Sequence, residues 1–270
     1  MSNDFRVIAE AFSCTSERYD AFAQDHAHLT HLRNKVYIHL QRFLGGGANI
    51  LELNAGTGID AVELAQRGYR VHATDIAAGM LARLHEKIQR LEMGDRVAIQ
   101  QCSFTRLDEV VGGPYDAVFS DLGGLNCIAD LRPVIQQLPL VLKPGGLVTW
   151  VLMPPTCLWE MAELLRGHFR LAFRRYARNG ALTHLEGYYF QTYYFTPRQV
   201  IDWFGSDYEL LGIEGLSVIT PTAESKYFPL RHPRLYSWLA WLDDRLAPRR
   251  PWCGWGDFFI VSLRSRHEAS

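Results

Sequence analysis

Apolar side chains recur along the middle of this chain in two alternating patterns. Short apolar runs predict buried strands, and the segments between them carry an apolar residue every three or four positions, as helices do. Strands separated by helices of this length form parallel β-α-β units, so the pattern predicts a doubly wound α/β sheet. We place strands at 50–53, 69–74, 97–101, 116–119 and 147–152, and helices at 59–67, 77–92 and 130–141.

The segments on either side of this alternation follow other patterns. Residues 5–44 have helical spacing until Gly45-Gly46-Gly47 interrupts it. Residues 153–205 are rich in aromatic and arginine side chains, and we expect them to form a lid with an apolar pocket beneath it. Two later strands are predicted near 208–218 and 258–263, with an irregular stretch at 220–256 between them.

A glycine turn, Asn54-Ala55-Gly56-Thr57-Gly58, joins the first of these strands to a helix. Glycine lets the backbone approach a ligand closely, and the free N–H groups at a helix N-terminus are donors for it. Gly56-x-Gly58-x-x-Ala61 also fits the dinucleotide fingerprint. A carboxylate at Glu52, however, would repel a pyrophosphate and hold an ammonium group. The turn therefore predicts a ligand site that suits an amino-acid ammonium.

Four polar residues lie where predicted strands end: Glu52, Asp75, Ser103 and Asp121. The carboxyl ends of parallel strands share one edge of a sheet, so we expect these side chains in one site. Asp75 suits the two hydroxyls of a ribose, although an aspartate before a helix is also a good N-cap. Asp121 either touches a ligand or caps a turn, and the sequence leaves both open.

Composition narrows the class of protein. The 270 residues carry a net charge of −1, which does not indicate a nucleic-acid partner. The five cysteines are scattered and contain no C-x-x-C pair, so neither a disulfide framework nor a metal site is expected. Because the chain shows no signal segment and no apolar run of membrane-spanning length, we expect a soluble, cytoplasmic protein without a membrane partner.

Four motifs follow one another in order: Glu52 to Gly58, Ala73 to Ile76, Tyr115 to Ser120, and Leu142 to Gly146. Together they resemble the motifs of S-adenosylmethionine-dependent methyltransferases with the Rossmann-like (class I) fold, over residues 15–152. The run Gly123-Gly124-Leu125-Asn126-Cys127 is similar to a bacterial small-molecule branch. The resemblance implies a seven-stranded, mostly parallel sheet whose last strand is antiparallel. It also implies S-adenosyl-L-methionine as cofactor and S-adenosyl-L-homocysteine as product.

The resemblance assigns cofactor contacts position by position. Glu52 and the turn would meet the methionine moiety, Arg33 its carboxylate, and Asp75 the ribose. The adenine would pack on Ile76 and Met80 with its edge toward Ser103 and Phe104, and Asp121 with Leu122 would line the sulfonium end. The expected cofactor-binding residues are Tyr19, Arg33, Glu52, Asn54, Ala55, Gly56, Gly58, Asp75, Ile76, Met80, Ser103, Phe104, Asp121 and Leu122.

Two positions depart from the family pattern. Asn54 stands where the first glycine is usual, and asparagine tolerates a left-handed turn. Ser103 replaces the acidic residue that usually meets the adenine amino group, which weakens that contact or leaves it to the backbone.

The implied reaction is an in-line transfer of a methyl group to a small-molecule acceptor in a dry pocket that aligns the two reactants. The acceptor, the methylated atom, the oligomeric state and a catalytic residue stay unassigned. An oxygen acceptor would need a base, for which His184 is the candidate, against the alternative that it is structural. Nucleic-acid methylation is disfavoured, since the only basic stripe, 166–178, fits a solvated lid helix and no N/D-P-P-Y/F tetrapeptide follows the fourth strand.

Two alternatives to methyl transfer remain from the residues themselves. An NAD(P)-dependent oxidoreductase could use the same glycine turn and Asp75, but Glu52 and the long helical segment before the first strand stand against it. A non-catalytic cofactor-binding scaffold is the other alternative. For the methyltransferase we expect four parts: an N-terminal helical cap over the cofactor (1–47), a Rossmann-like core (48–152), an aromatic lid (153–205), and the final strands with their insertion (206–270).

Overall fold

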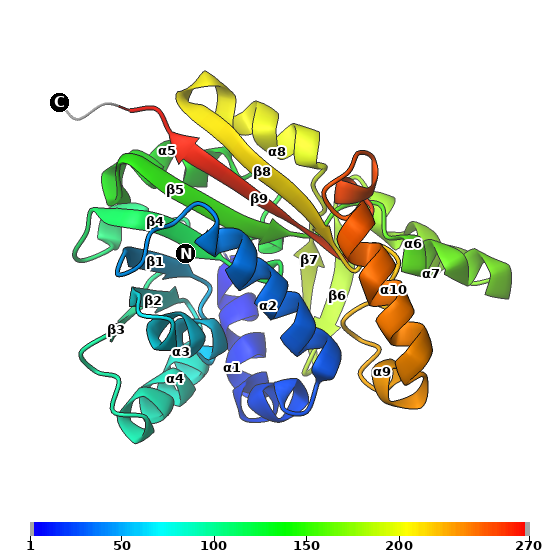
Figure 1. Cartoon of the computed structure of the whole chain (residues 1–270). Helices are drawn as coiled ribbons and strands as arrows, with labels where there is room; N and C mark the ends of the chain where they lie inside the picture. The colour runs from blue at the N-terminus through cyan, green and yellow to red at the C-terminus, as the bar shows by residue number, and fades with distance from the viewer. Residues whose placement is uncertain (1–2, 268–270) are drawn as a thin grey trace.

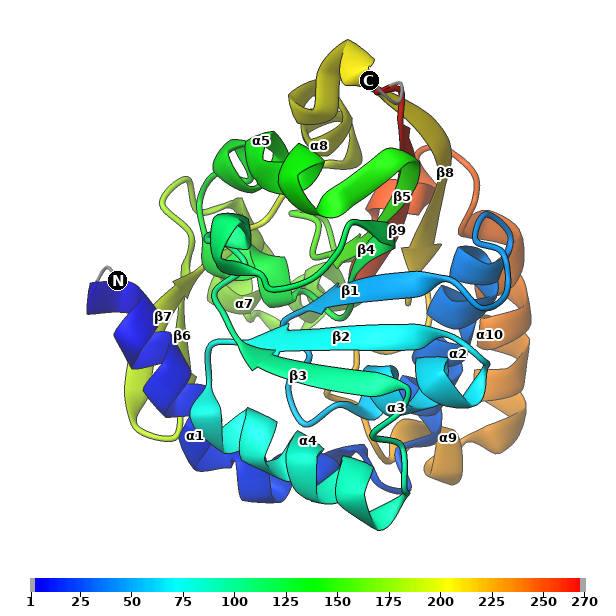
Figure 2. The same ribbon diagram turned by 90° about the vertical axis from the view of Figure 1, so that its left-hand side faces the viewer.

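A computed structural model describes residues 3–267. Seven strands form one twisted sheet in the order β3-β2-β1-β4-β5-β9-β8 (Figures 1 and 2). Strands β1 to β5 are parallel, and β9 runs antiparallel to both of its neighbours. The predicted seven-stranded sheet with an antiparallel last strand is confirmed. The strands are β1 (Asn49–Leu53), β2 (Arg70–Asp75), β3 (Val97–Gln101), β4 (Tyr115–Ser120), β5 (Leu142–Leu152), β8 (Tyr208–Leu216) and β9 (Phe258–Ser265).

Helices cover both faces of this sheet because successive strand residues point to opposite sides. Ile50 belongs to a core beneath α2, α3 and α4, whereas its neighbour Leu51 packs in a second core beneath α5 and α8. Both side chains are fully buried, as a strand covered on two faces requires. These helices are α2 (Ala27–Gln41), α3 (Ile59–Gln66), α4 (Ala78–Arg90), α5 (Arg132–Val141) and α8 (Pro197–Phe204).

The segment 5–44, which the spacing predicts as helical, is divided into α1 (Asn3–Ala23) and α2. The chain turns at Asp25, whose φ of 56° lies in the left-handed region. The ring of His26 then accepts a hydrogen bond from the Leu29 N–H and so caps α2. As a result α1 leaves the body of the sheet and lies across its carboxyl edge (Figure 2).

The lid segment contains a β-hairpin that the sequence pattern did not predict. Strands β6 (Ala181–Leu185) and β7 (Tyr188–Thr192) pair around the left-handed turn Glu186-Gly187. The hairpin packs against α1, where the rings of Phe12 and Phe190 are 6.0 Å apart. The lid also holds α6 (Leu158–Met161) and α7 (Phe169–Phe173), and the later insertion holds α9 (Phe228–Arg231) and α10 (Pro233–Leu246). None of the helices within residues 3–267 is long and apolar enough to cross a membrane.

Candidate active site

A cavity of about 270 Å³ lies at the carboxyl ends of β1, β2 and β4. The loops after these strands form one wall, and α1 with the β6–β7 hairpin forms the other. Residues of α1 reach the cavity at a spacing of three and four, which places them on one side of the helix. The covering side chains are Phe5, Ile8, Phe12 and Tyr19 from α1, and Thr183, Phe190 and Thr192 from the hairpin.

The glycine turn after β1 has the backbone that the sequence predicts. Asn54, Gly56 and Gly58 all have left-handed φ angles, of 58°, 55° and 75°. Asn54 therefore takes the conformation that its family position demands. Gly56 lines the cavity, and no atom within 4 Å would meet a side chain added there. Gly58 has a packing role instead, because an added Cβ would lie 2.0 Å from Cδ1 of the buried Leu84 on α4.

We expect Gly58→Ala to lower the free energy of unfolding by about 2–4 kcal/mol, since it combines a left-handed alanine with overlap in a packed core. Gly56→Ala is the matched control, because it has the same backbone strain without the overlap and should cost about 1 kcal/mol. Urea unfolding of both variants measures the difference. Equal losses would show that the contact with Leu84 is not what requires glycine at position 58.

Asp75 holds the turn and the start of the next helix together. Its Oδ2 accepts a hydrogen bond from the Gly56 N–H and its Oδ1 one from the Ala77 N–H, both at 2.8 Å. Burial raises the pKa of this carboxyl, and the backbone donors partly offset that rise. The side chain still lines the cavity, so local capping and contact with a ligand are compatible.

A buried cluster of charged and phenolic groups surrounds Arg33, and we call it the Arg33 cluster. Its members come from α2, α3 and the ends of β1 and β4. The guanidinium Nε lies 3.0 Å from Asp60 Oδ1 and 3.8 Å from Asp121 Oδ2, and the Tyr37 hydroxyl donates to Asp60. Although burial opposes its charge, these carboxylates hold the pKa of Arg33 above its usual value. The cluster consists of Arg33, Tyr37, Glu52, Asp60 and Asp121.

Three polar atoms in and beside this cluster have no hydrogen-bond partner among the residues that the structure describes. They are Glu52 Oε2, Asn54 Nδ2 and Asp121 Oδ2, and each is buried. Burial, reinforced by nearby Asp60, raises the pKa of both Glu52 and Asp121. Three carboxylates thus share one arginine in a dry place, which is costly unless they hold protons or a cation binds among them.

The structure brings most of the predicted site residues together. Glu52, Gly58 and Ser103 do not line the cavity: Glu52 lies behind its wall, Gly58 packs on α4, and the Ser103 hydroxyl pairs with Thr105 at 2.8 Å. Phe104, which the resemblance assigns to the same edge of the adenine as Ser103, does line the cavity. The predicted residues that line it are Tyr19, Arg33, Asn54, Ala55, Gly56, Asp75, Ile76, Met80, Phe104, Asp121 and Leu122.

Sequence reasoning missed several lining residues. Asp60 is one of them, although its place in the first turn after Gly58 is a detectable signal. The helical spacing of Phe5, Ile8 and Phe12 could likewise have indicated one face of α1. His184, the candidate base, is exposed, and its ring contacts the Tyr189 ring in a tilted arrangement with centroids 4.7 Å apart. Its neighbour Thr183 faces the cavity instead, as strand alternation requires, so the structure does not support His184 as a base.

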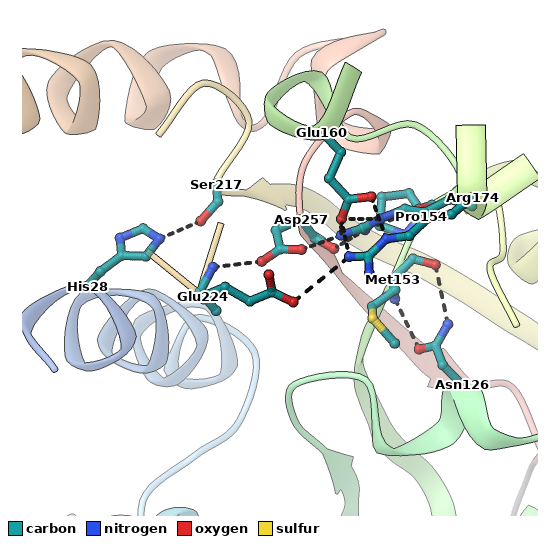
Figure 3. Close-up of polar contacts among 11 residues, drawn as sticks. His28, Asn126, Met153, Pro154, Glu160, Arg174, Ser217, Glu224 and Asp257 are labelled. Atoms are coloured by element: carbon teal, nitrogen blue, oxygen red, sulfur yellow. Dashed lines mark hydrogen bonds and ion pairs between the residues drawn. The ribbon is translucent and has the colours of Figure 1, made fainter. Parts of the chain in front are cut away.

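A second buried ion cluster attaches the lid to the sheet (Figure 3). Arg175 donates to Glu160 and to Asp257 at 2.6 Å each, and Arg174 donates to Glu160 at 2.7 Å. Glu160 and Asp257 also lie close to Cys157, and the three side chains offer donor atoms of the kind that bind a metal ion. The Arg175 guanidinium already compensates both carboxylates, so the geometry fits an ion network that fastens the lid.

Comparison with known proteins finds a methyltransferase domain within the chain. Residues 50–146 match a family model described as a methyltransferase domain. The tRNA 5-carboxymethoxyuridine methyltransferase of Escherichia coli K12 is 24% identical over 216 residues, covering 80% of this chain and 79% of that protein. The demethylmenaquinone methyltransferase of Mycobacterium marinum is 30% identical over 152 residues, covering 54% of this chain and 59% of that protein.

A solved structure of the same fold is Burkholderia thailandensis 1,6-didemethyltoxoflavin-N1-methyltransferase with bound 1,6-didemethyltoxoflavin and S-adenosylhomocysteine. It superposes with a TM-score of 0.57 at 15% identity, covering 97% of this chain and 88% of that one. This chain contains a methyltransferase domain over residues 50–146 and has the class I methyltransferase fold. The domain match favours methyl transfer over the nicotinamide alternative that the glycine turn left open, and with the methyltransferase relatives it confirms the enzyme class that the motifs implied.

Proposed function

We propose that this methyltransferase transfers a methyl group from S-adenosyl-L-methionine to a small-molecule acceptor. The cofactor part of the proposal rests on the Arg33 cluster, in which Asp121 lines the cavity, Glu52 lies buried beside it, and one oxygen of each lacks a hydrogen-bond partner among the described residues. An amino-acid group has an ammonium and a carboxylate, and the cluster offers both an excess of negative charge and a guanidinium. A dinucleotide pyrophosphate would meet the same carboxylates unfavourably.

The remaining contacts follow from which side chains line the cavity. Arg33 would bind the methionine carboxylate through the guanidinium N–H groups that Asp60 leaves free, and Asp75 would accept from the ribose hydroxyls. Ile76 and Met80 provide an apolar surface for the adenine. The protein's part in the reaction is to align donor and acceptor and exclude water, which can lower the barrier by roughly 7–11 kcal/mol.

A small acceptor is favoured by the wall that α1 and the hairpin place over the cavity. Phe12 and Phe190 form its apolar part, and Thr183 and Thr192 pair with each other at 2.7 Å rather than offering charge. Such a wall suits a neutral or apolar ring and gives no site for a phosphate. In this proposal residues 1–47 and 153–205 cover the core, 48–152, as the sequence pattern suggests.

The acceptor class can be tested with S-adenosyl-L-methionine labelled on its methyl group. The enzyme is incubated with a low-mass filtrate of a bacterial extract, with unfractionated tRNA, or with neither. We expect label in soluble small molecules other than S-adenosyl-L-methionine only when the filtrate is present. Label that precipitates with tRNA would contradict a small-molecule acceptor, and would leave the cofactor assignment intact.

The pKa shifts in the Arg33 cluster predict an unusual pH dependence. Because burial raises the pKa of Glu52 and Asp121, the folded protein keeps protons that the unfolded chain releases near its usual values of about 4. The free energy of unfolding should therefore fall as the pH rises from about 4 through the raised values. Bound ammonium favours the ionised carboxylates, so the affinity for S-adenosylhomocysteine should rise over the same interval.

Glu52→Gln tests this dependence because glutamine keeps the shape but cannot ionise. Between about pH 5 and pH 8 the unliganded variant should lose less unfolding free energy than the parent protein. At the higher pH it should bind S-adenosylhomocysteine about tenfold more weakly, which corresponds to about 1.4 kcal/mol. Urea unfolding and calorimetry at both pH values measure the two effects. If the unfolding free energy and the affinity of variant and parent change with pH in the same way, ionisation of Glu52 does not cause the pH dependence.

A further inference from the structure

The outer side of α9 and α10 exposes apolar side chains and arginines together. Leu235, Trp238 and Trp241 recur every three residues along α10, and the two tryptophans are 55% and 51% exposed. Ala240 and Asp243 lie on the opposite side of the helix and are buried. We call the exposed set the α10 stripe. It consists of Leu230, Arg231, Arg234, Leu235, Trp238, Trp241 and Arg245.

The charge of this region differs from that of the whole chain. Residues 224–251 contain six lysines and arginines against three carboxylates, a net charge of +3 in a chain whose total is −1. All three carboxylates are engaged: Asp243 and Asp244 lie 3.6 and 2.9 Å from Lys35, and Glu224 lies 3.9 Å from Arg174. The exposed charge of the α10 stripe is therefore positive. Arg245 stacks on Trp241 with its guanidinium carbon 3.6 Å from the ring centroid.

The lid also exposes apolar side chains and an arginine beside the α10 stripe. Leu165 is 92% exposed and Phe169 64% exposed, and the lid between them carries Arg166. The Trp159 ring contacts the Phe228 ring at 5.6 Å between centroids, so the lid and α9 touch. In Figure 1, α7, α9 and α10 lie at the same end of the molecule, far from β3.

We propose that the α10 stripe binds the anionic surface of a lipid membrane. Tryptophan rings prefer the boundary between headgroups and acyl chains, the leucines need an apolar phase, and arginine pairs with lipid phosphate. A helix of this kind lies in the plane of the interface and does not span it. The proposal revises the expectation of no membrane partner, which rested on the total charge and on the absence of a spanning segment.

Two other occupants fit the α10 stripe less well. A nucleic acid would pair with the arginines and stack on the tryptophans, but it provides no apolar phase for Leu230 and Leu235. A second copy of the chain, related by a twofold axis, would bring two positively charged patches together, because such a contact uses the same patch on both subunits. An anionic bilayer satisfies both kinds of side chain at once.

The test is flotation of the full-length chain with vesicles of phosphatidylcholine alone or mixed equally with phosphatidylglycerol. We expect binding to the anionic vesicles that weakens as salt is raised, and at least tenfold weaker binding of the double variant Trp238→Ser/Trp241→Ser. Leu140→Ser is the matched control, since Leu140 is 64% exposed on α5, outside the α10 stripe, and should bind as the parent does. Tryptophan quenching of the parent protein by brominated anionic lipid gives a readout that needs no variant.

Several results would overturn the proposal. The first is that the parent protein neither binds anionic vesicles nor shows tryptophan quenching with them. The second is that it binds neutral vesicles as well as anionic ones. The third is that the double variant binds anionic vesicles as tightly as the parent does. Retention of unfractionated tRNA in a gel shift, lost in the double variant and without vesicle binding, would assign the α10 stripe to nucleic acid. A dimer in sedimentation that the double variant dissociates would assign it to a second copy.

Discussion

Replacing Arg175 by alanine should lower the free energy of unfolding by about 3–5 kcal/mol, because it removes one partner of a buried ion network. Arg175 is only 5% exposed. It donates to Glu160, to the Asp257 carboxylate and to the Asp257 carbonyl, at 2.6, 2.6 and 2.9 Å. Its loss leaves an oxygen of Asp257 buried without its cation. The lid would then be less firmly fastened to the start of β9.

Arg174→Ala is the matched control for this prediction. Arg174 binds the same Glu160, but its side chain is 37% exposed, so solvent screens the charge that its removal leaves. We expect a loss of about 1 kcal/mol or less, measured by urea unfolding beside Arg175→Ala. Equal losses for the two variants would mean that the buried network does not hold the lid, and that Glu160 alone accounts for the effect.

Replacing Asp75 by alanine should weaken S-adenosylhomocysteine binding at least 100-fold, or about 2.7 kcal/mol. The change removes the acceptor for two backbone N–H groups and, in our proposal, for the ribose hydroxyls. Asp75→Asn keeps one acceptor oxygen and should show an intermediate loss. Isothermal titration of parent and variants measures the three affinities.

A loosened glycine turn alone could weaken binding, so the ribose contact needs its own readout. The 2′-deoxy analogue of S-adenosylhomocysteine lacks one of the hydroxyls assigned to Asp75. It should bind the parent protein about tenfold more weakly than the natural ligand, but bind Asp75→Ala with the same affinity as the natural ligand. An unchanged preference for the natural ligand in the variant would show that Asp75 only organises the turn.

The parts of the fold that were predictable are those in which local sequence determines structure. Apolar runs such as Leu147 to Leu152 are buried on two faces, and strand ends such as Asp75 reach one edge because parallel connectivity requires it. Asn54 was expected to take a left-handed turn, and it does. Each of these inferences needs only neighbouring residues and a general rule.

The parts that were missed depend on contacts between distant segments. Asp60 and Arg33 stand 27 positions apart, and only the packing of α2 on α3 brings them within 3.0 Å. The break at Asp25 divides the segment 5–44 into two helices. It sets the direction of α1, which the spacing of the apolar residues does not predict. His184 and Thr183 are adjacent in the sequence, yet the register of an unpredicted hairpin turns only Thr183 toward the cavity.

The central claim is that the cavity beside the Arg33 cluster binds the methionine and adenosine parts of S-adenosyl-L-methionine. The most direct test is calorimetric titration of the purified chain with S-adenosylhomocysteine and, separately, with NADH and NADPH. We predict micromolar binding of S-adenosylhomocysteine and no binding of either nicotinamide nucleotide. Binding of NADH or NADPH, without binding of S-adenosylhomocysteine, would contradict the assignment of the site.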